Sequence, residues 1–304
     1  MQSPTRRLAL GGGLLTTALL LTGGRVAARD ASQTVRLGRV TVPVMVNGRG
    51  PFNFAIDSAA NCSVIAEDLL PELSMTPQSR LVMHTLVGAE EVDAVFADQI
   101  ESGSLREAST RLAVGRRTAL EGLDGLIGAD LLIGRRLTLR FRGAARARIG
   151  QSRRTERGFL DPVDPKARLI APAEERFNGL LMVPAMTGSA RSVAIVDSGA
   201  AVTVLNRAAA IAGGAQSWRM RSGERFSRLQ SPTGRSAEAE VMLLPLLRVA
   251  EASIFNVPVL AGDFHVFNLW GVSDRPAMLM GVDVLGLFES VTIDLKRREF
   301  SLRV

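Results

Sequence analysis

Short stretches of alternating apolar and polar residues, separated by Gly, Pro and Asn, make up much of the chain. In the first of them, residues 40–46 alternate and are rich in Val, Asn47-Gly48 follows, and apolar residues resume within 52–56. A period of two is typical of a half-buried strand, and Asn-Gly is a strong signal for a two-residue hairpin turn. The pattern therefore predicts a hairpin whose second strand ends at Asp57.

This pattern occurs a second time. Residues 181–196 read as a strand, a turn at Thr187-Gly188 and a return strand that leads to Asp197, 140 residues after the first aspartate. Both copies contain Val-Pro-x-Met, which begins at Val42 and at Val183. Because a whole strand–turn–strand unit recurs, we interpret the chain as an internal repeat of two related halves.

A second pair of matched motifs follows the aspartates. In each half an apolar strand reaches Gly-x-Asp, as Gly128 to Asp130 and as Gly281 to Asp283. The glycines allow a neighbouring backbone to approach closely. The aspartates are placed to cap short helices.

The remaining elements are short. Between its two motifs each half contains another predicted hairpin, which turns at Gly88-Ala89 in the first half and near Gly234 in the second. The strongest helical patterns, at 66–70 and 207–212, directly follow the aspartate motifs. Many short strands and few helices make the predicted fold class mostly β.

These patterns divide the chain into four parts. Residues 35–150 and 177–304 are the two predicted β lobes, and residues 151–176, polar and containing three prolines, are the predicted linker. Residues 1–28 are a predicted signal peptide, since Arg6-Arg7 precede an apolar stretch and a small-residue cleavage site. The paired arginines are a weak match to a twin-arginine signal. We expect export to the periplasm or the medium, with no stable membrane insertion after cleavage.

The composition excludes several kinds of site and binding partner. The net charge of +7 includes three arginines of the predicted signal, and the rest is spread along the chain, which indicates solubility rather than a nucleic-acid surface. Cys62 is the only cysteine, which excludes an internal disulfide. His84 and His265 are the only histidines, which argues against a His-rich metal site and a Ser-His-Asp triad. We expect no metal and no cofactor.

The two aspartates that end the predicted strands, Asp57 and Asp197, are the candidate functional residues. A buried carboxylate is costly unless it has partners, and a single aspartate at a strand end commonly caps a turn. A matched pair in a repeated unit indicates instead a shared acid site. Two carboxylates held close together cannot both ionise easily, so they share a proton and one acts as base while the other acts as acid.

A family resemblance rests on these motifs. Asp-Ser-Gly-Ala at 197–200, followed by β-branched residues and by an apolar-apolar-Gly strand that places Gly281 84 residues after Asp197, resembles an aspartic protease. Asp-Ser-Ala-Ala at 57–60 is a weaker match, with Gly128 71 residues after Asp57. The compact halves are similar to the retropepsin-like branch, here with both lobes in one chain.

The resemblance implies a pseudo-twofold fold of two homologous β lobes with short helices, in which the two aspartate loops meet at the centre. It implies Asp57 and Asp197 as the catalytic pair. It also implies that Ser58 and Ser198 brace the two loops through hydrogen bonds between them.

Further expectations concern the cleft and the substrate. The hairpins around Gly88 and Gly234 would be flaps over the cleft. The implied activity is that of a monomeric endopeptidase that binds an extended peptide or protein substrate by β-pairing.

Ala59 departs from the family pattern, which has Gly at this position with its amide facing the carboxylate. A methyl group there could crowd the loop unless the residue has a negative φ. This departure favours one alternative, a catalytically silent peptide-binding module with the same fold. A second alternative, which does not depend on Ala59, is a homodimer whose interface carries the site.

Overall fold

The computed structural model describes residues 27–30, 39–141, 146–152, 168–177, 179–220, 223–231 and 233–304. The predicted signal peptide lies outside the described residues except for Ala27 and Ala28, and so does most of the predicted linker. In the part of the chain that is described, no helix has both the length and the apolar character needed to cross a membrane.

The chain forms many strands and a few short helices, which confirms the predicted mostly β class. The strands of the first half and of the chain before it are β1 (Ala27–Asp30), β2 (Thr41–Val46), β3 (Arg49–Ile56), β4 (Val64–Ala66), β5 (Ser79–Thr85), β6 (Gly88–Ser102), β7 (Leu105–Gly115), β8 (Gly125–Ile127), β9 (Arg135–Arg140) and β10 (Arg146–Gln151). The later strands are β11 (Arg168–Pro172), β12 (Glu174–Arg176), β13 (Leu180–Thr187), β14 (Ala190–Val196), β15 (Val204–Leu205), β16 (Gln216–Ser217), β17 (Phe226–Gln230), β18 (Ser236–Val249), β19 (Ala252–Ala261), β20 (Ala277–Met280), β21 (Ser290–Asp294) and β22 (Glu299–Arg303). The helices are the 3-10 helix η1 (Glu67–Leu69), α1 (Ala129–Leu132), α2 (Arg207–Ala212), α3 (His265–Leu269) and α4 (Val282–Leu285).

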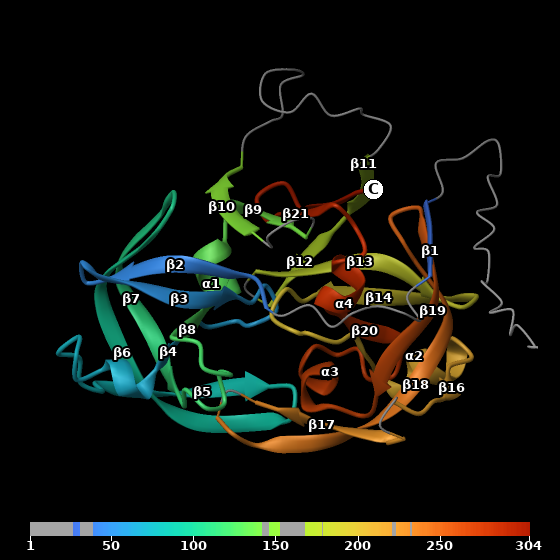
Figure 1. The fold of residues 1–304 in the computed structure, drawn as a ribbon, viewed down its shortest axis with the longest axis horizontal. Helices are drawn as coiled ribbons and strands as arrows, with labels where there is room; N and C mark the ends of the chain where they lie inside the picture. Colours follow the sequence, from blue (N-terminus) through green and yellow to red (C-terminus); the bar gives the residue numbers. More distant parts are fainter. Residues whose placement is uncertain are drawn as a thin grey trace, which may run out of the picture.

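Two large sheets follow the same strand order. The first runs β2-β3-β8-β4-β7-β6-β5, and β2 also pairs with β6, so the sheet closes on itself. In the second the corresponding path is β13-β14-β20-β15-β19-β18, with β13 also paired to β18 and β17 added to β18. Figure 1 shows the two sheets beside each other, the first in blue to green and the second in yellow to orange-red.

A third sheet joins the two halves. Its order is β10-β9-β21-β22-β11, so the closing hairpins of both halves contribute to it. The central pairing is β9 with β21, where Leu137 faces Ile293 and Leu139 faces Val291. All four side chains are buried, so an apolar layer fixes this connection between the halves.

The first hairpin forms where the sequence predicts it. Asn47 and Gly48 join β2 to β3 with φ values of 51° and 73°, the left-handed conformation that a two-residue hairpin turn requires. On β2, Val42, Val44 and Val46 are buried while the residues between them are more exposed. The alternation in the sequence therefore does correspond to an inward and an outward face.

Other predicted elements differ in detail. The helix predicted at 66–70 is reduced to η1, because Ala66 ends β4 and its amide donates to Asp124 O at 2.9 Å. Strand pairing outweighs a weak helix propensity here. The helix predicted at 207–212 is confirmed as α2, and the side chain of Asn206 caps it by accepting from Ala209 N at 2.8 Å.

The predicted turns and the linker also differ in part. The first mid-half hairpin turns at Leu86-Val87 and not at Gly88-Ala89, because Thr85 pairs with Gly88 across β5 and β6. The second turns between Gln230 and Ser236, around Gly234 as predicted. The end of the predicted linker contains β11 and β12, since these strands pair with β22 and β13.

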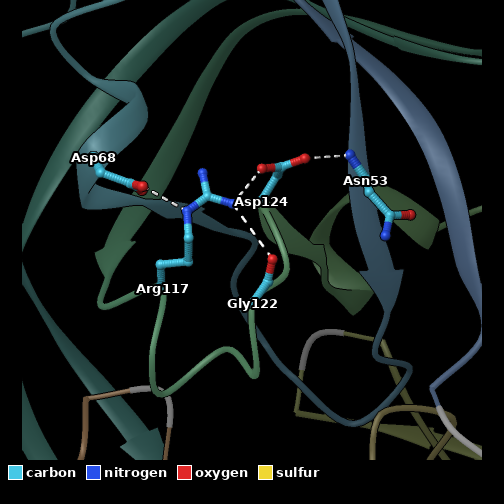
Figure 2. Close-up of polar contacts among 5 residues, drawn as sticks. All are labelled: Asn53, Asp68, Arg117, Gly122 and Asp124. Carbon is cyan, nitrogen blue, oxygen red and sulfur yellow. Dashed lines mark hydrogen bonds and ion pairs between the residues drawn. The ribbon is translucent and has the colours of Figure 1, made fainter.

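A network around Arg117 fixes the start of β8 (Figure 2). The Arg117 guanidinium pairs with Asp68 of η1 and with Asp124 just before β8, and it donates to Gly122 O at 3.4 Å. Asp124 in turn accepts from Asn53 N on β3 at 2.6 Å. Strands β3 and β8 are thereby held in register next to the first aspartate loop.

Candidate active site

The two aspartates occupy equivalent places in the two sheets. Asp57 follows β3 and its amide donates to Ile127 O on β8 at 2.9 Å. Asp197 follows β14 and its amide donates to Met280 O on β20 at 3.0 Å. In both halves a parallel pair of buried strands therefore sets the position of the carboxylate.

Ser58 and Ser198 link the two aspartate loops through four reciprocal hydrogen bonds. Ser58 Oγ donates to Val196 O at 2.7 Å and accepts from Ser198 N at 3.1 Å. Ser198 Oγ donates to Ile56 O at 2.8 Å and accepts from Ser58 N at 3.1 Å. Both serines are buried, so water does not compete for these bonds. The structure thus brings together all four residues that the sequence singled out at the centre.

The two carboxyl groups lie near each other, and each binds its own loop. Asp57 Oδ1 accepts from the amides of Ala59 at 3.1 Å and Ala60 at 2.9 Å. Asp197 Oδ1 accepts from the two equivalent amides of its own loop, both at 2.9 Å. The carboxyl groups of Asp57 and Asp197 lie close enough for each to influence the pKa of the other. Two acids in this arrangement can hold one proton between them.

Burial is the main influence on the acidity of the pair. It raises the pKa of Asp57, while the positive charge of Arg39 and the two amide donors oppose the rise. Burial, and then the negative charge of Asp57, raise the pKa of Asp197 to about 8 against the same kinds of opposing groups. Asp197 is only 7% exposed, whereas Asp57 is half-buried. The pair therefore retains a proton near neutral pH.

Sequence reasoning missed Arg39. It directly precedes Val40, whose carbonyl accepts from Ile56 N at 3.1 Å, so Arg39 lies beside the strand that leads to Asp57. Its side chain is 19% exposed, and Nε and Nη1 have no hydrogen-bond partner in the described part of the chain. Nothing in the sequence indicates that the charge of Arg39 acts on the two aspartates, because Arg39 is one of many arginines and lies just outside a core strand.

The Arg39 charge also makes the site asymmetric. If Val42-Pro43 is matched to Val183-Pro184, Arg39 corresponds to Leu180, which is fully buried in an apolar cluster of the second half. The first half therefore contributes a cation near the acid pair where the second half contributes an apolar side chain.

Ala59 is accommodated without loss of its hydrogen bond. It is not among the non-glycine residues with positive φ in the described chain, and its amide still donates to Asp57. The half-buried residue packs against the apolar cluster of the second half that contains Leu180. The crowding that the sequence suggested at this position is thus avoided.

Asp130 and Asp283 brace the aspartate loops, so the prediction that they cap helices is wrong. The N-terminal caps of α1 and α4 are glycines, without a side-chain cap. Asp130 accepts from Ser63 N at 3.0 Å and Ser63 Oγ at 2.8 Å. Asp283 accepts from Thr203 N at 2.9 Å and Thr203 Oγ1 at 2.7 Å. Burial raises the pKa of both, and that of Asp283 to about 6.

The glycines of the second motif permit a close backbone contact, as predicted. A β-carbon on Gly128 would lie 2.8 Å from Ala60 O, and one on Gly281 would lie 2.9 Å from Ala200 O. The amides that follow these glycines donate to the same two carbonyl oxygens, at 2.7 and 2.8 Å. A side chain at either glycine would push the aspartate loop out of place.

The two mid-half hairpins contact each other. Glu90 on β6 accepts from Thr233 Oγ1 and lies 3.8 Å from Arg235 Nε, both in the turn between β17 and β18. Arg235 also reaches Ala89 O at 3.5 Å. Figure 1 shows β5 and β17 approaching each other at the lower edge of the molecule, below α3. Their role as flaps remains a prediction.

Together these features define an aspartic-protease-like fold with a central pair of aspartates. The family model described as aspartyl protease matches residues 42–131, the stretch from β2 to α1 that contains Asp57 and Gly128. The predicted resemblance to an aspartic protease is confirmed over this stretch.

Solved structures with a similar chain course were also found. A retropepsin-like aspartic protease from Rickettsia conorii is 17% identical and aligns over 44% of this chain and 89% of that chain, with a TM-score of 0.32. Basic 7S globulin from soybean is 9% identical and aligns over 88% of this chain and 94% of that chain, with a TM-score of 0.47. Comparison with curated protein sequences gives no match.

Proposed function

We propose that the protein is an aspartic endopeptidase in which Asp57 and Asp197 activate a water molecule for attack on a peptide bond. The observation that carries this proposal is the placement of the two carboxyl groups side by side, on loops joined by Ser58 and Ser198, with each carboxylate held by two amides of its own loop. Burial favours retention of one proton by the pair, which is the state that acid–base catalysis requires.

The asymmetry of the site supports different roles for the two aspartates. Asp57 is the ionised member and the general base, because it is more exposed and because the Arg39 charge is the strongest influence that lowers its pKa, whereas the same charge has the weakest influence on Asp197. Asp197 carries the shared proton, because it is more deeply buried and faces the negative charge of Asp57. The pair exchanges these states during the reaction.

In the proposed reaction Asp57 takes a proton from water while the water oxygen bonds to the carbonyl carbon. Asp197 gives its proton to the carbonyl oxygen, which yields a neutral tetrahedral diol. Asp57 then protonates the departing nitrogen, the C–N bond breaks, and Asp197 regains a proton from a diol hydroxyl. The products are an amine and a carboxylic acid, and the pair returns to its starting state.

The proposed substrate is an extended peptide that pairs with strand edges between the two mid-half hairpins. Apolar side chains are expected beside the scissile bond. This expectation is supported by Ala59, Leu86 and Val202, half-buried residues that pack against one apolar cluster of the second half. Frequent cleavage beside charged residues would contradict it.

We further propose that the enzyme is an exported monomer. The export proposal rests on the signal pattern in residues 1–28. The monomer proposal is supported by the presence of both aspartates in one chain whose halves share the β9–β21 pairing. Light scattering at several concentrations tests it, and a stable dimer mass would contradict it.

The decisive experiment is digestion of a diverse peptide pool from pH 3 to 8, read by mass spectrometry. The full chain, or its exported form, is compared with Asp57→Asn and Asp197→Asn. We expect cleavage by the wild type and none by either variant. If folded wild type binds peptides and cuts none at any pH, the proposal is wrong and the silent peptide-binding module is favoured. The Ala59→Gly variant then shows whether the methyl group suppresses activity.

A further inference from the structure

The two histidines of the chain contact each other across the two halves. His84 lies on β5 of the first half and His265 begins α3 of the second half. His84 Nδ1 is 2.9 Å from His265 Nε2, and the two rings meet edge to edge, with centroids 5.2 Å apart and planes within 8° of parallel. These two imidazoles, the only ones in the sequence, therefore form one hydrogen-bonded pair.

The pair fastens the tip of the β5–β6 hairpin near the aspartate loop. The amide of His265 donates to Leu86 O in the hairpin turn at 3.1 Å. Leu86 packs against the apolar cluster of the second half, and Ala59 of the Asp57 loop packs against the same cluster. The hairpin tip and the aspartate loop thus share one apolar support.

The bond between two imidazoles depends on their charge. A neutral imidazole has one N–H donor and one acceptor nitrogen, whereas a protonated imidazole has two donors and no acceptor. The bond therefore forms while at least one ring is neutral. When both rings are protonated it is lost, and two positive charges face each other. Imidazole is the side chain whose charge ordinarily changes between pH 5 and 8.

The acidic groups on the elements around the two histidines form ion pairs with arginines. In the described chain none of these carboxylates forms a hydrogen bond with either imidazole. They belong to β6, to the segment before α3 and to the turn after β17, and their ion pairs are Glu90–Arg235, Glu91–Arg80 and Asp263–Arg207. Nothing on these elements therefore replaces the bond when both rings are charged.

We propose that His84 and His265 are positioning residues that hold the β5–β6 hairpin closed beside the acid pair and release it when both become protonated. The proposal rests on the proposed function, because it treats this hairpin as a cover of the peptide cleft. Release at acid pH admits substrate under conditions in which the acid pair retains its shared proton.

Three variants separate this proposal from a purely structural role. In His84→Asn the amide oxygen takes the place of Nδ1 and accepts from protonated His265, so the bond persists at low pH. In His84→Leu the bond is absent at every pH. Arg106→Gln is the control, because it breaks an exposed ion pair with Glu101 at the other end of β6 and leaves the histidines untouched.

The measurement is hydrogen–deuterium exchange of the backbone amides at Leu86, Val87, Gly88 and His265, at pH 5 and pH 8, corrected for the intrinsic exchange rate. Wild type and Arg106→Gln are expected to lose about tenfold in protection on acidification. His84→Asn is expected to keep its protection, and His84→Leu to lack it at both pH values.

Equal protection of wild type at both pH values would overturn the proposal, and so would a loss in His84→Asn that matches wild type. The exchange is measured without substrate, so a failure to cut peptides leaves this readout intact. If the protein cleaves peptides while amide exchange in the hairpin is independent of pH, the role proposed for the two histidines is wrong and the proposed activity stands.

Discussion

The backbone of Gly199 faces the carboxyl group of Asp57 so closely that a β-carbon on Gly199 would lie 2.2 Å from Asp57 Cγ. The equivalent position of the first loop holds Ala59, whose methyl group is accommodated against the second-half apolar cluster. The two loops are therefore alike in their hydrogen bonds and different in the space beside them. A side chain is tolerated on one loop only.

Substitution of Gly199 is expected to disrupt the acid pair. In Gly199→Ala the methyl group overlaps Asp57, so the loop must move, at a cost of about 1–3 kcal/mol in stability and with loss of peptide cleavage. Urea unfolding and cleavage of a reporter peptide measure the two effects. Ala59→Gly is the control and should keep both fold and activity. If Gly199→Ala still cleaves the reporter peptide, the loop accommodates a methyl group at this position and the prediction is wrong.

The serine pair is expected to act as a unit. Ser58→Ala removes a donor to Val196 O and an acceptor for Ser198 N, both buried, and should cost about 1–3 kcal/mol. Ser198→Ala should cost a similar amount, because it removes the mirror-image bonds. The double variant should cost less than the sum, since each hydroxyl accepts from the amide of the other serine and the four bonds hold the same two loops together. Urea denaturation of the four proteins forms the cycle, and strict additivity would argue against a shared network.

The charge of Arg39 is expected to set the pH range of activity. Arg39→Met removes a cation that lowers the pKa of both aspartates, so both limbs of the pH profile of kcat/KM should move to higher pH. Arg39→Lys keeps the charge and is the control, with a profile close to wild type. An unchanged profile in Arg39→Met would mean that the cation does not act on the acid pair.

Stability is expected to fall as the pH rises from 4 to 8. Burial raises the pKa of Asp283 to about 6 and that of Asp197 to about 8. A carboxyl group whose pKa is higher in the folded state stabilises the fold fully below its unfolded value, and this contribution is lost as the pH rises through the folded value. For Asp283 alone the whole effect is about 3 kcal/mol, of which about 2 kcal/mol is lost between pH 4 and 6.

Urea unfolding of Asp283→Asn at several pH values tests this dependence. The variant should show a smaller decrease in unfolding free energy between pH 4 and 6 than wild type, whatever its absolute stability. Asp98→Asn, an exposed position on β6, is the matched control and should follow wild type. Identical slopes for Asp283→Asn and wild type would contradict the assignment.

Much of the fold could be predicted because short stretches of sequence specify its turns and strands. The hairpin at Asn47-Gly48 follows from turn chemistry, and the places of Asp57 and Asp197 follow from the apolar strands that end there. The helix predicted at 66–70 failed because strand β4 takes Ala66 into the sheet, which no local propensity encodes.

The centre of the site was predictable for the same reason. The two serines follow the two aspartates directly, so any fold that brings the aspartate loops together also brings the serines together. Asp130 and Asp283 were misassigned as helix caps, because their hydroxyl partners Ser63 and Thr203 lie far away in sequence and reach them only through packing.

The sequence by itself determined the two repeated strand–turn–strand units, the aspartate at the end of each and the glycines that the loops approach. Periodicity and turn geometry act over a few residues, and the sequence displays them directly. Only the tertiary structure decided the placement of Arg39 beside the acid pair and the contact of His84 with His265, 181 residues apart. Contacts of that range arise when the β halves pack, because burial of apolar faces sets which distant side chains become neighbours.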